Sequence, residues 1–599
     1  MGETVAGRFD VVVVGGGHAG CEAALAAARM GCRTALVTLH IDKIALMPCN
    51  PAVGGVGKGQ LTREIDALGG EQGRNTDRAF VQIKMLNTSK GPAVRALRAQ
   101  ADKQVYQRLM ARELLRQPNI ELRQGEVDRV LTQGGRVSGV RTLTGEVIPC
   151  RAVVVASGVY LNSRVIIGEQ DWAAGPQGLL RAMGLSRSLM DLGFSLRRFK
   201  TGTPARLDSR SIDFDQMSPQ PGDEPVEAFS FLGRTQPRNL MSCYLTWTNE
   251  RTHQLIRDNL HRSPMFSGSI QGTGARYCPS IEDKVHRFAD KDRHQVFLEP
   301  EGLDGLEWYA QGLSSSLPEE VQRALYRSVK GLSRAVLTRL AYAIEYDVID
   351  PMELSPAMAA RRVPGLFLAG QINGTSGYEE AAAQGLMAGI NASRYVEGQA
   401  PFILTRDQAY IGVLTDDLCS KGVDEPYRMM TGRAEYRLSL RQDNADLRLT
   451  HLGHAIGLVD GERLRRLEYK QRQMAQYLDA LRDSGRLEAL RRGEEPAETK
   501  MPPFDAEAVR QAHIQIKYEG YLQKEAAQIR AAAAMESQRL PEDADYLGIS
   551  ALRVEARQKL DRQRPISLGQ AGRIPGVTPA DVAVLAVWLK KHRAGQDSA

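Results

Sequence analysis

The most constraining feature of this 599-residue sequence is a glycine pattern near its start, Gly15-x-Gly17-x-x-Gly20. Glycines at this spacing permit a tight turn and let backbone N–H groups approach a pyrophosphate at a helix N-terminus. The pattern is informative only between a strand and a helix, and the flanking runs meet that condition. A buried strand, a helix and a second strand are predicted at residues 8–14, 21–30 and 33–38. We therefore predict a dinucleotide site formed by Gly15, Gly16, Gly17, His18, Ala19 and Gly20.

The second predicted strand ends in Thr38-Leu39-His40, where most such sites carry an acid for the ribose hydroxyls. Three alternatives stay open. Thr38 takes that role, a backbone group takes it, or the ribose is held from elsewhere in the chain.

Later strands distinguish NAD from FAD. Buried strands are predicted at residues 152–156 and 366–369, and the second of them runs into Gly370 and a helix at 378–392. Two-part FAD-binding folds return to their first domain in this way. FAD is therefore favoured, with Gln371, Asn373 and Gly374 as further contacts, although an ordinary strand-to-helix turn remains the alternative.

Composition excludes several classes of protein. The sequence is 42% hydrophobic and 25% charged, which is typical of a folded globular protein. No apolar run approaches the length of about 18 residues that a membrane span needs, and no signal peptide is visible. Seven scattered cysteines without a C-x-x-C pair suit a reducing compartment and no metal site. We expect a cytoplasmic protein that does not bind membranes.

These patterns predict an α/β fold with a two-part FAD-binding Rossmann-like domain, an inserted α+β domain and a helical C-terminal domain. The mixed, Pro- and Gly-rich region near 200–300 suggests the insertion, and the charged, helix-prone region from about 407 suggests the last domain. Residues 494–504 are expected to form a linker. The predicted bounds are 1–200 and 331–405 for the two FAD-binding parts, 201–330 for the insertion and 406–599 for the C-terminal domain.

A glycine-rich loop at residues 48–59 carries a single thiol, Cys49. It is not a phosphate-binding Walker A loop, because Ala52 and Gly59 stand where that motif needs glycine and a hydroxyl residue. A lone cysteine near a flavin can act as a nucleophile or as an acid–base group. It can equally be a small buried residue, and the residues alone do not decide between these readings.

A second polar loop at residues 274–284 combines a thiol, two cations and two acids. Cys278 is its thiol, Arg276 and Lys284 could bind phosphates, and Asp283 or Glu282 could move protons. A salt-bridged surface turn is the alternative.

Basic residues gather in the last third of the chain. Arg433, Arg437 and Arg441 follow a spacing of four residues, which predicts one helix face suited to phosphates or, alternatively, to an ion network with nearby acids. Residues 551–599 hold nine Lys or Arg against four acids, most of the net charge of +7. We expect Arg573, Lys590 and Lys591 to contact a polyanion, although a solvated surface is the simpler reading.

Long segments of the chain resemble one family closely, the tRNA uridine 5-carboxymethylaminomethyl modification enzymes MnmG, also called GidA. The resemblance spans nearly the whole chain. The most specific segments are residues 15–20, 49–59, 87–95, 200–204, 276–284, 370–385, 425–428, 443–448 and 516–521.

The resemblance implies an FAD enzyme with NADH as reductant that pairs with the GTPase MnmE as a complex of homodimers. Together they would add an aminomethyl or carboxymethylaminomethyl group to C5 of the wobble uridine of tRNA. Methylenetetrahydrofolate would donate the carbon, and glycine or ammonium the nitrogen. The wobble base would have to leave the anticodon stack to reach the flavin.

The resemblance also assigns residues. The two cysteines of interest map onto Cys49 and Cys278, FAD contacts onto residues 15–20, Val127 and Gln371, and an NAD-binding stretch onto residues 274–288, which include Gly274. One departure concerns Ala182, which stands where the family has a serine that contacts FAD.

Three other functions remain open. The first is the folate- and FAD-dependent methyltransferase of the tRNA T-loop uridine, which lacks a long helical C-terminal region. The second is a two-cysteine flavoprotein reductase, which the lack of a paired cysteine disfavours. The third is a non-catalytic tRNA-binding scaffold that keeps its flavin for structure.

Overall fold

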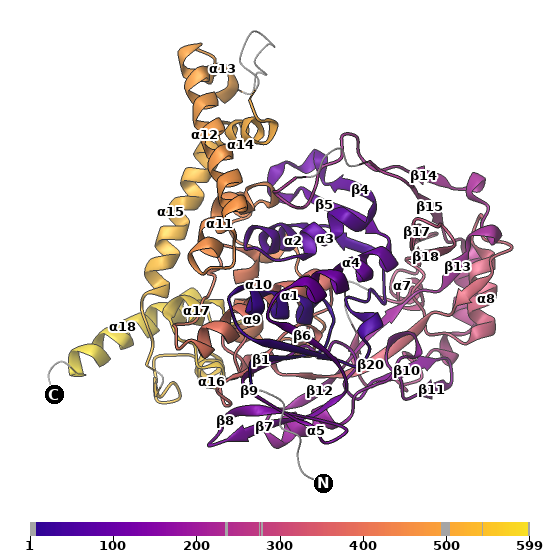
Figure 1. Cartoon of the computed structure of the whole chain (residues 1–599), viewed down its shortest axis with the longest axis horizontal. Helices are drawn as coiled ribbons and strands as arrows, with labels where there is room; N and C mark the ends of the chain where they lie inside the picture. Colours follow the sequence, from indigo (N-terminus) through magenta and orange to yellow (C-terminus); the bar gives the residue numbers. More distant parts are fainter. Residues whose placement is uncertain are drawn as a thin grey trace.

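The glycine turn of residues 15–20 lies at the end of the first strand of a twisted sheet (Figure 1). The computed structural model describes residues 8–233, 238–274, 276, 279–492, 504–541 and 543–596. Within these residues the strands form four sheets, and a group of helices extends to one side of them (Figure 1).

The first sheet has seven strands in the order β6-β2-β1-β9-β8-β7, with β21 paired to the second half of β9. β6, β2, β1, β9 and β21 run parallel, whereas β7 and β8 join β9 as antiparallel hairpins. The strand predictions are confirmed, although β9 begins five residues early because its first half pairs with β8. The bounds are β1 Phe9–Val14, β2 Thr34–Thr38, β6 Ile120–Gln124, β7 Val127–Gln133, β8 Arg136–Thr142, β9 Val147–Val155 and β21 Leu366–Leu368.

Two helices fasten the late strand to the early one. α1 (His18–Arg29) packs against α9 (Tyr378–Val396), and both helices are almost entirely buried. A Cβ atom at Gly385 or Gly389 would collide with the α1 backbone at Ala19 or Ala23. Only glycine permits this approach, which places the turn after β21 beside the glycine turn after β1.

A small antiparallel sheet, β3-β5-β4, carries the loop of Cys49. β3 follows that loop directly, and α2 begins shortly after β3, so the glycine-rich segment is held at both ends. The bounds are β3 Ala52–Gly54, β4 Phe80–Leu86, β5 Ala96–Ala101, α2 Lys58–Ala67, α3 Gln72–Ala79 and α4 Lys103–Arg116.

The region between the two parts of the first sheet builds two more sheets. One has the order β11-β10-β20-β12-β16 and the other, fully antiparallel, the order β14-β15-β17-β18-β13-β19. A second apolar core, formed by residues between 205 and 341, surrounds the latter. The bounds are β10 Arg164–Ile167, β11 Gln170–Trp172, β12 Leu196–Thr203, β13 Arg206–Asp208, β14 Ser218–Gln220, β15 Cys243–Trp247, β16 Thr273–Gly274, β17 Gln295–Pro300, β18 Glu307–Gln311, β19 Leu337–Arg339, β20 Tyr342–Ile349, α5 Gly184–Asp191, α6 Glu250–Asp258, α7 Ile281–Arg287 and α8 Glu319–Ser328.

The described part of the chain after residue 405 is helical, as predicted. Its first helices pack into the core of the first sheet as far as Leu458, whereas residues 540–589 form a separate core of their own. α15 runs between them and buries no residue (Figure 1). The linker expected at 494–504 lies outside the described residues except for Phe504. The bounds are α10 Tyr410–Lys421, α11 Ala445–Ala455, α12 Gly461–Asp483, α13 Leu487–Arg491, α14 Ala506–Lys517, α15 Glu519–Glu536, α16 Val554–Gln563, α17 Leu568–Arg573 and α18 Pro579–Gln596.

None of the helices among the described residues combines the length and the apolar character that crossing a bilayer requires.

Candidate cofactor and active site

A cavity of about 510 Å³ opens at the carboxyl ends of β1, β9 and β21. This is the edge at which parallel α/β sheets bind their ligands. The inserted sheets and the Cys49 loop complete its walls. The cavity therefore combines segments that are far apart in the sequence.

The glycine turn has the shape that the sequence predicts. Gly15 adopts a φ of +107°, and a side chain at Gly15 or Gly20 would collide with neighbouring backbone. A Cβ atom at Gly17, by contrast, would meet no atom within 4 Å, although Gly17 lines the cavity. α1 starts at the next residue with no acid in its first turn, so its N-terminal N–H groups can attract an anion.

His18 lies at the start of α1 and stacks on the ring of Tyr378, with the ring centroids 4.5 Å apart. Burial lowers the pKa of His18 to about 4, although Glu379 opposes the shift. The imidazole is therefore neutral at neutral pH, and the positive potential at this point comes from the N-terminus of α1.

The end of β2 lacks an acid, as the sequence shows, yet the structure places one nearby. Glu126, between β6 and β7, lines the cavity together with Thr38 and His40. Glu126 could therefore hold the ribose from outside β2, which was the third of the three alternatives. Sequence reasoning missed Glu126, although its neighbour Val127 was predicted and also lines the cavity.

Ala182 lines the cavity too, but it offers only a methyl group where the family has a serine. Ser157, after β9, supplies a hydroxyl in the same cavity. Its Oγ is buried and has no hydrogen-bond partner among the described residues.

Only part of the cofactor contacts predicted after strand β21 line the cavity. Gly370 and Gln371 line the cavity. Asn373 and Gly374 do not; the Asn373 amide instead donates to the Leu368 carbonyl and to Gln384 at 2.8 Å each. Asn373 therefore holds the turn in place and makes no direct contribution to the cavity wall.

Cys49 lies in the same cavity, half-buried, with its Sγ atom 3.2 Å from the hydroxyl of Tyr309. Its backbone N–H donates to the Tyr378 hydroxyl at 3.0 Å, and that hydroxyl donates to the Asn50 carbonyl. The contact with Tyr309 and its place in the cavity favour a functional thiol over a merely space-filling one.

A buried ion cluster holds the backbone carbonyl of Cys49. Lys103 Nζ and Arg206 Nη2 both donate to the Cys49 carbonyl, at 2.7 and 2.8 Å, and both pair with Glu301. Burial lowers the pKa of Lys103 to about 8, although Glu301 opposes the shift. Sequence reasoning missed Lys103, Arg206, Glu301 and Tyr309, because they come from segments 50 to 260 residues away from Cys49 with no shared spacing.

None of the described residues of the second polar loop lines this cavity. Gly274 in β16 pairs with Lys200 in β12, and Arg276 is exposed, with its Nε atom 3.5 Å from a carboxylate oxygen of Glu425. Asp283 accepts a hydrogen bond from Arg287 at 2.8 Å, and Lys284 Nζ donates to the Gly312 carbonyl at 3.4 Å. Cys278 lies outside the described residues. The catalytic roles predicted for Cys278, Asp283 and Lys284 stay predictions.

The prediction of one helix face for three arginines is wrong. Arg433 ends a single 3₁₀ turn, and the following residues up to Arg441 are irregular. The reason is that side chains bond the backbone carbonyls that a helix would need: Arg406 donates to the Arg433 carbonyl and Arg441 to the Leu438 carbonyl.

The three arginines also differ in exposure. Arg441 is 2% exposed and donates to Asp443 and Gln511, so it cannot bind a phosphate, and the alternative of an ion network is correct for it. Arg433 lies half-buried over the ring of Tyr427. Arg437 is exposed.

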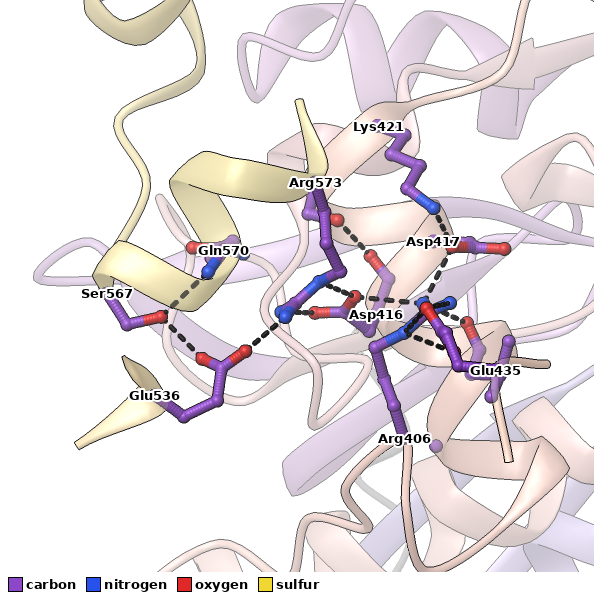
Figure 2. A network of polar contacts seen from close by, with 12 residues as sticks. Arg406, Asp416, Asp417, Lys421, Glu435, Glu536, Ser567, Gln570 and Arg573 are labelled. Atoms are coloured by element: carbon purple, nitrogen blue, oxygen red, sulfur yellow. Dashed lines mark hydrogen bonds and ion pairs between the residues drawn. The ribbon is translucent and has the colours of Figure 1, made fainter. Parts of the chain in front are cut away.

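Arg573, expected to contact a polyanion, instead forms ion pairs within the protein. Figure 2 shows it reaching from α17 toward Asp416 on α10, 3.1 Å away, and toward Glu536 at the end of α15. Asp416 also pairs with Arg406. Arg573 thus ties the C-terminal core to the body of the protein, whereas Lys590 and Lys591 on α18 are exposed as expected.

Comparisons with known proteins agree with the geometry. The model of the family "Glucose inhibited division protein A" matches residues 10–400, and that of the "tRNA modifying enzyme MnmG/GidA C-terminal helical bundle" matches residues 528–599. The tRNA uridine 5-carboxymethylaminomethyl modification enzyme MnmG of Heliobacterium modesticaldum is 52% identical over 99% of this chain and 98% of its own. MnmG of Lachnoclostridium phytofermentans is 52% identical over 98% of both chains.

The solved structure of Aquifex aeolicus GidA in its form II crystal is 45% identical, covers 98% of this chain and 99% of its own, and superposes with a TM-score of 0.91. The resemblance found in the sequence is confirmed by matches that extend over both the sheets and the C-terminal helices. The chain belongs to the MnmG/GidA family of tRNA-modifying enzymes.

Proposed function

We propose that this protein is an FAD-dependent enzyme that modifies C5 of the wobble uridine of tRNA. One observation carries the proposal: a single cavity combines a dinucleotide-type glycine turn with the thiol of Cys49. The names of the relatives, which are tRNA uridine modification enzymes, supply the class of substrate.

The residues of the cavity fit FAD. Gly17 leaves a space that any side chain would fill, next to the free N-terminus of α1, where a pyrophosphate would bind. Three buried polar atoms, His18 Nε2, His40 Nε2 and Ser157 Oγ, have no hydrogen-bond partner among the described residues. Gln371 and Val127 would contact the cofactor from the other walls. FAD would supply electron transfer when bound.

Cys49 would act on the uracil ring. A thiolate that adds to C6 makes C5 nucleophilic, and the same thiol could alternatively serve as an acid–base group. Tyr309 Oη, 3.2 Å from Sγ, can exchange a proton with the thiol or orient it. Lys103 and Arg206 hold the Cys49 carbonyl and so fix the thiol's position.

The remaining components rest on the family. We propose NADH as reductant, methylenetetrahydrofolate as one-carbon donor, and glycine or ammonium as nitrogen donor. We propose the GTPase MnmE as partner, in a complex of two homodimers, in the cytoplasm. Gly274 and Arg276 would belong to the NADH-binding stretch, and Cys278, Asp283 and Lys284 would act in catalysis. Exposed Arg437, Lys590 and Lys591 would contact tRNA phosphates.

The test begins with the visible spectrum of the purified chain. The protein is then incubated with NADH, methylenetetrahydrofolate, MnmE with GTP, glycine and unmodified tRNA, and the digested tRNA is analysed by mass spectrometry. A flavin spectrum and a C5-modified wobble uridine are expected. Modification confined to the T-loop would instead identify the methyltransferase, and flavin without any RNA product would favour the scaffold.

A further inference from the structure

Two sequence segments that the cavity does not use meet at its mouth. The loop at residues 87–95 connects β4 to β5. Leu86, directly before the loop, and Arg98, three residues after it in β5, line the cavity. The second segment is the junction of α14 and α15. A Cβ atom at Gly91 would lie 3.6 Å from the hydroxyl of Tyr518 at that junction.

The loop presents unpaired cations. Lys90 and Arg95 are exposed, and neither forms an ion pair with any residue in the described part of the chain. Arg95 donates to the Thr88 carbonyl through Nε at 3.3 Å and Nη2 at 3.0 Å, which holds the loop closed while the Arg95 side chain stays exposed. The loop is therefore a preformed basic feature.

The junction presents two neighbouring aromatic rings, of which Tyr518 is half-buried and Tyr521 is exposed. The rings of Tyr518 and Tyr521 lie 6.5 Å apart, and Tyr521 is 67% exposed. One turn further along α15, Glu525 accepts the backbone N–H groups of Leu438 and Ser439, at 3.3 and 2.8 Å, beside exposed Arg437. An exposed tyrosine of this kind has lost the free energy of burying its ring, and it is available for stacking.

Buried contacts join the loop and the α14–α15 junction through a third segment, the irregular stretch of residues 437–442. Gln442 accepts the Leu97 N–H at 2.9 Å and donates to the Met85 sulfur, at the base of the loop. Buried Arg441 and Gln511 join the irregular segment to α14. The cations and the tyrosines are thus held together on one rigid frame.

We propose that the loop at residues 87–95 and the tyrosines of the α14–α15 junction form a binding surface for an unpaired RNA strand at the mouth of the cavity. Lys90, Arg95 and Arg437 bind its phosphates, and Tyr521 stacks a base. Basic grooves with interleaved aromatic rings bind single-stranded nucleic acid in this way. The inference rests on the proposed function, because it takes the cavity as the place where a base of the same RNA reacts.

The experiment measures the affinity of the full-length protein for a fluorescein-labelled stem–loop RNA with an anticodon loop, by anisotropy at several salt concentrations. Tyr521→Ala is expected to weaken binding roughly 5- to 150-fold, whereas Tyr521→Phe keeps the ring and the affinity. Lys90→Ala with Arg95→Ala is expected to reduce the slope of log affinity against log salt by about 1.4. Arg187→Ala, an exposed arginine on distant α5, is the matched control and should change neither (Figure 1).

Unchanged affinity in Tyr521→Ala and in the loop double variant would overturn the surface, even if the wild type modifies tRNA. Loss of MnmE binding with unchanged RNA binding would assign the surface to a protein and also overturn it. If the wild type binds the RNA, the variants do not, and no uridine is modified, the surface stands and the proposed function fails. Because the substituted side chains are exposed, the flavin spectrum and melting temperature of each variant should match the wild type.

Discussion

Replacing Gly17 by alanine separates cofactor binding from folding. Gly17 has a φ of −76° and a ψ of −172°, which any residue adopts, and a Cβ atom there meets no protein atom within 4 Å. The substitution should therefore leave the protein folded. Restricting the unfolded chain contributes about 0.4–1 kcal/mol of stability, and the loss of glycine at the N-cap of α1 costs a similar amount, so the stability of the apoprotein should change by less than about 1 kcal/mol.

The same methyl group would occupy the space beside the α1 N-terminus. Forcing one extra methyl into a filled site costs about 1–3 kcal/mol, which corresponds to a roughly 5- to 150-fold weaker affinity for FAD. Titration of the apoprotein with FAD, followed by flavin fluorescence, measures this loss. Urea unfolding of the same apoprotein measures stability.

Two further glycine variants serve as controls for Gly17→Ala. Gly520→Ala is the matched control, because a Cβ atom there also meets open space but lies outside the cavity, and FAD binding should not change. Gly20→Ala should destabilise the fold itself, since its methyl group collides with the Gly15 carbonyl. If Gly17→Ala binds FAD as tightly as the wild type, the glycine turn is not the cofactor cradle and the reasoning is refuted.

Three further predictions follow from the site. Cys49→Ser and Cys278→Ser should each keep FAD and lose tRNA modification; full activity of either variant by mass spectrometry would remove that thiol from the mechanism. The pKa of His18 is about 4 in the folded protein and about 6.5 in the unfolded chain, so only the unfolded state binds a proton there as pH falls from 6.5 to 4. The free energy of unfolding should therefore decrease by up to about 3 kcal/mol over this range. Urea unfolding of His18→Phe should lack that part of the pH dependence, and a profile identical to that of the wild type would contradict the pKa. Arg573→Ala removes the ion pairs with Asp416 and Glu536 and should speed proteolysis after α15 without changing the flavin spectrum, an effect that an unchanged cleavage rate would disprove.

The parts of the fold that depend on local pattern were predictable from the sequence. The valine run of β1, the glycines after it and the alanine-rich α1 each specify one element through burial or turn geometry. The late strand β21 was recognisable because a glycine follows it. The residues around Cys49 were not, because Lys103, Arg206 and Tyr309 come together only through the packing of separate sheets.

The arginine spacing shows why a periodic pattern can mislead. A spacing of four residues predicts one helix face only if the backbone is free to form helical hydrogen bonds. Here the carbonyls of Arg433 and Leu438 accept hydrogen bonds from Arg406 and Arg441 instead. Buried side-chain bonds of this kind outweigh a weak local propensity, and no single-sequence pattern reports them.

The basic C-terminal end must also be tested residue by residue. Its apolar core runs from Leu540 to Leu589, so a deletion that begins at residue 551 would cut the core and expose Tyr546 and Ile549. A loss of tRNA binding in such a truncation would report unfolding as readily as a lost contact. A truncation after Glu536 removes the whole unit instead.

Ion pairs reduce the number of basic residues in the C-terminal unit that are available to bind phosphates. Within this unit Arg553 pairs with Asp581, Lys559 with Glu555 and Arg564 with Asp561, so much of its apparent positive charge is neutralised. Lys590 and Lys591 are exposed and form no ion pair with the residues that the structure describes. Lys590→Ala with Lys591→Ala should therefore keep the fold and lower the salt dependence of tRNA binding by about 1.4–1.8 in slope. A full-length double variant with the wild-type slope would place the phosphate contacts elsewhere, and the net charge of the last 49 residues would then describe solubility and not recognition.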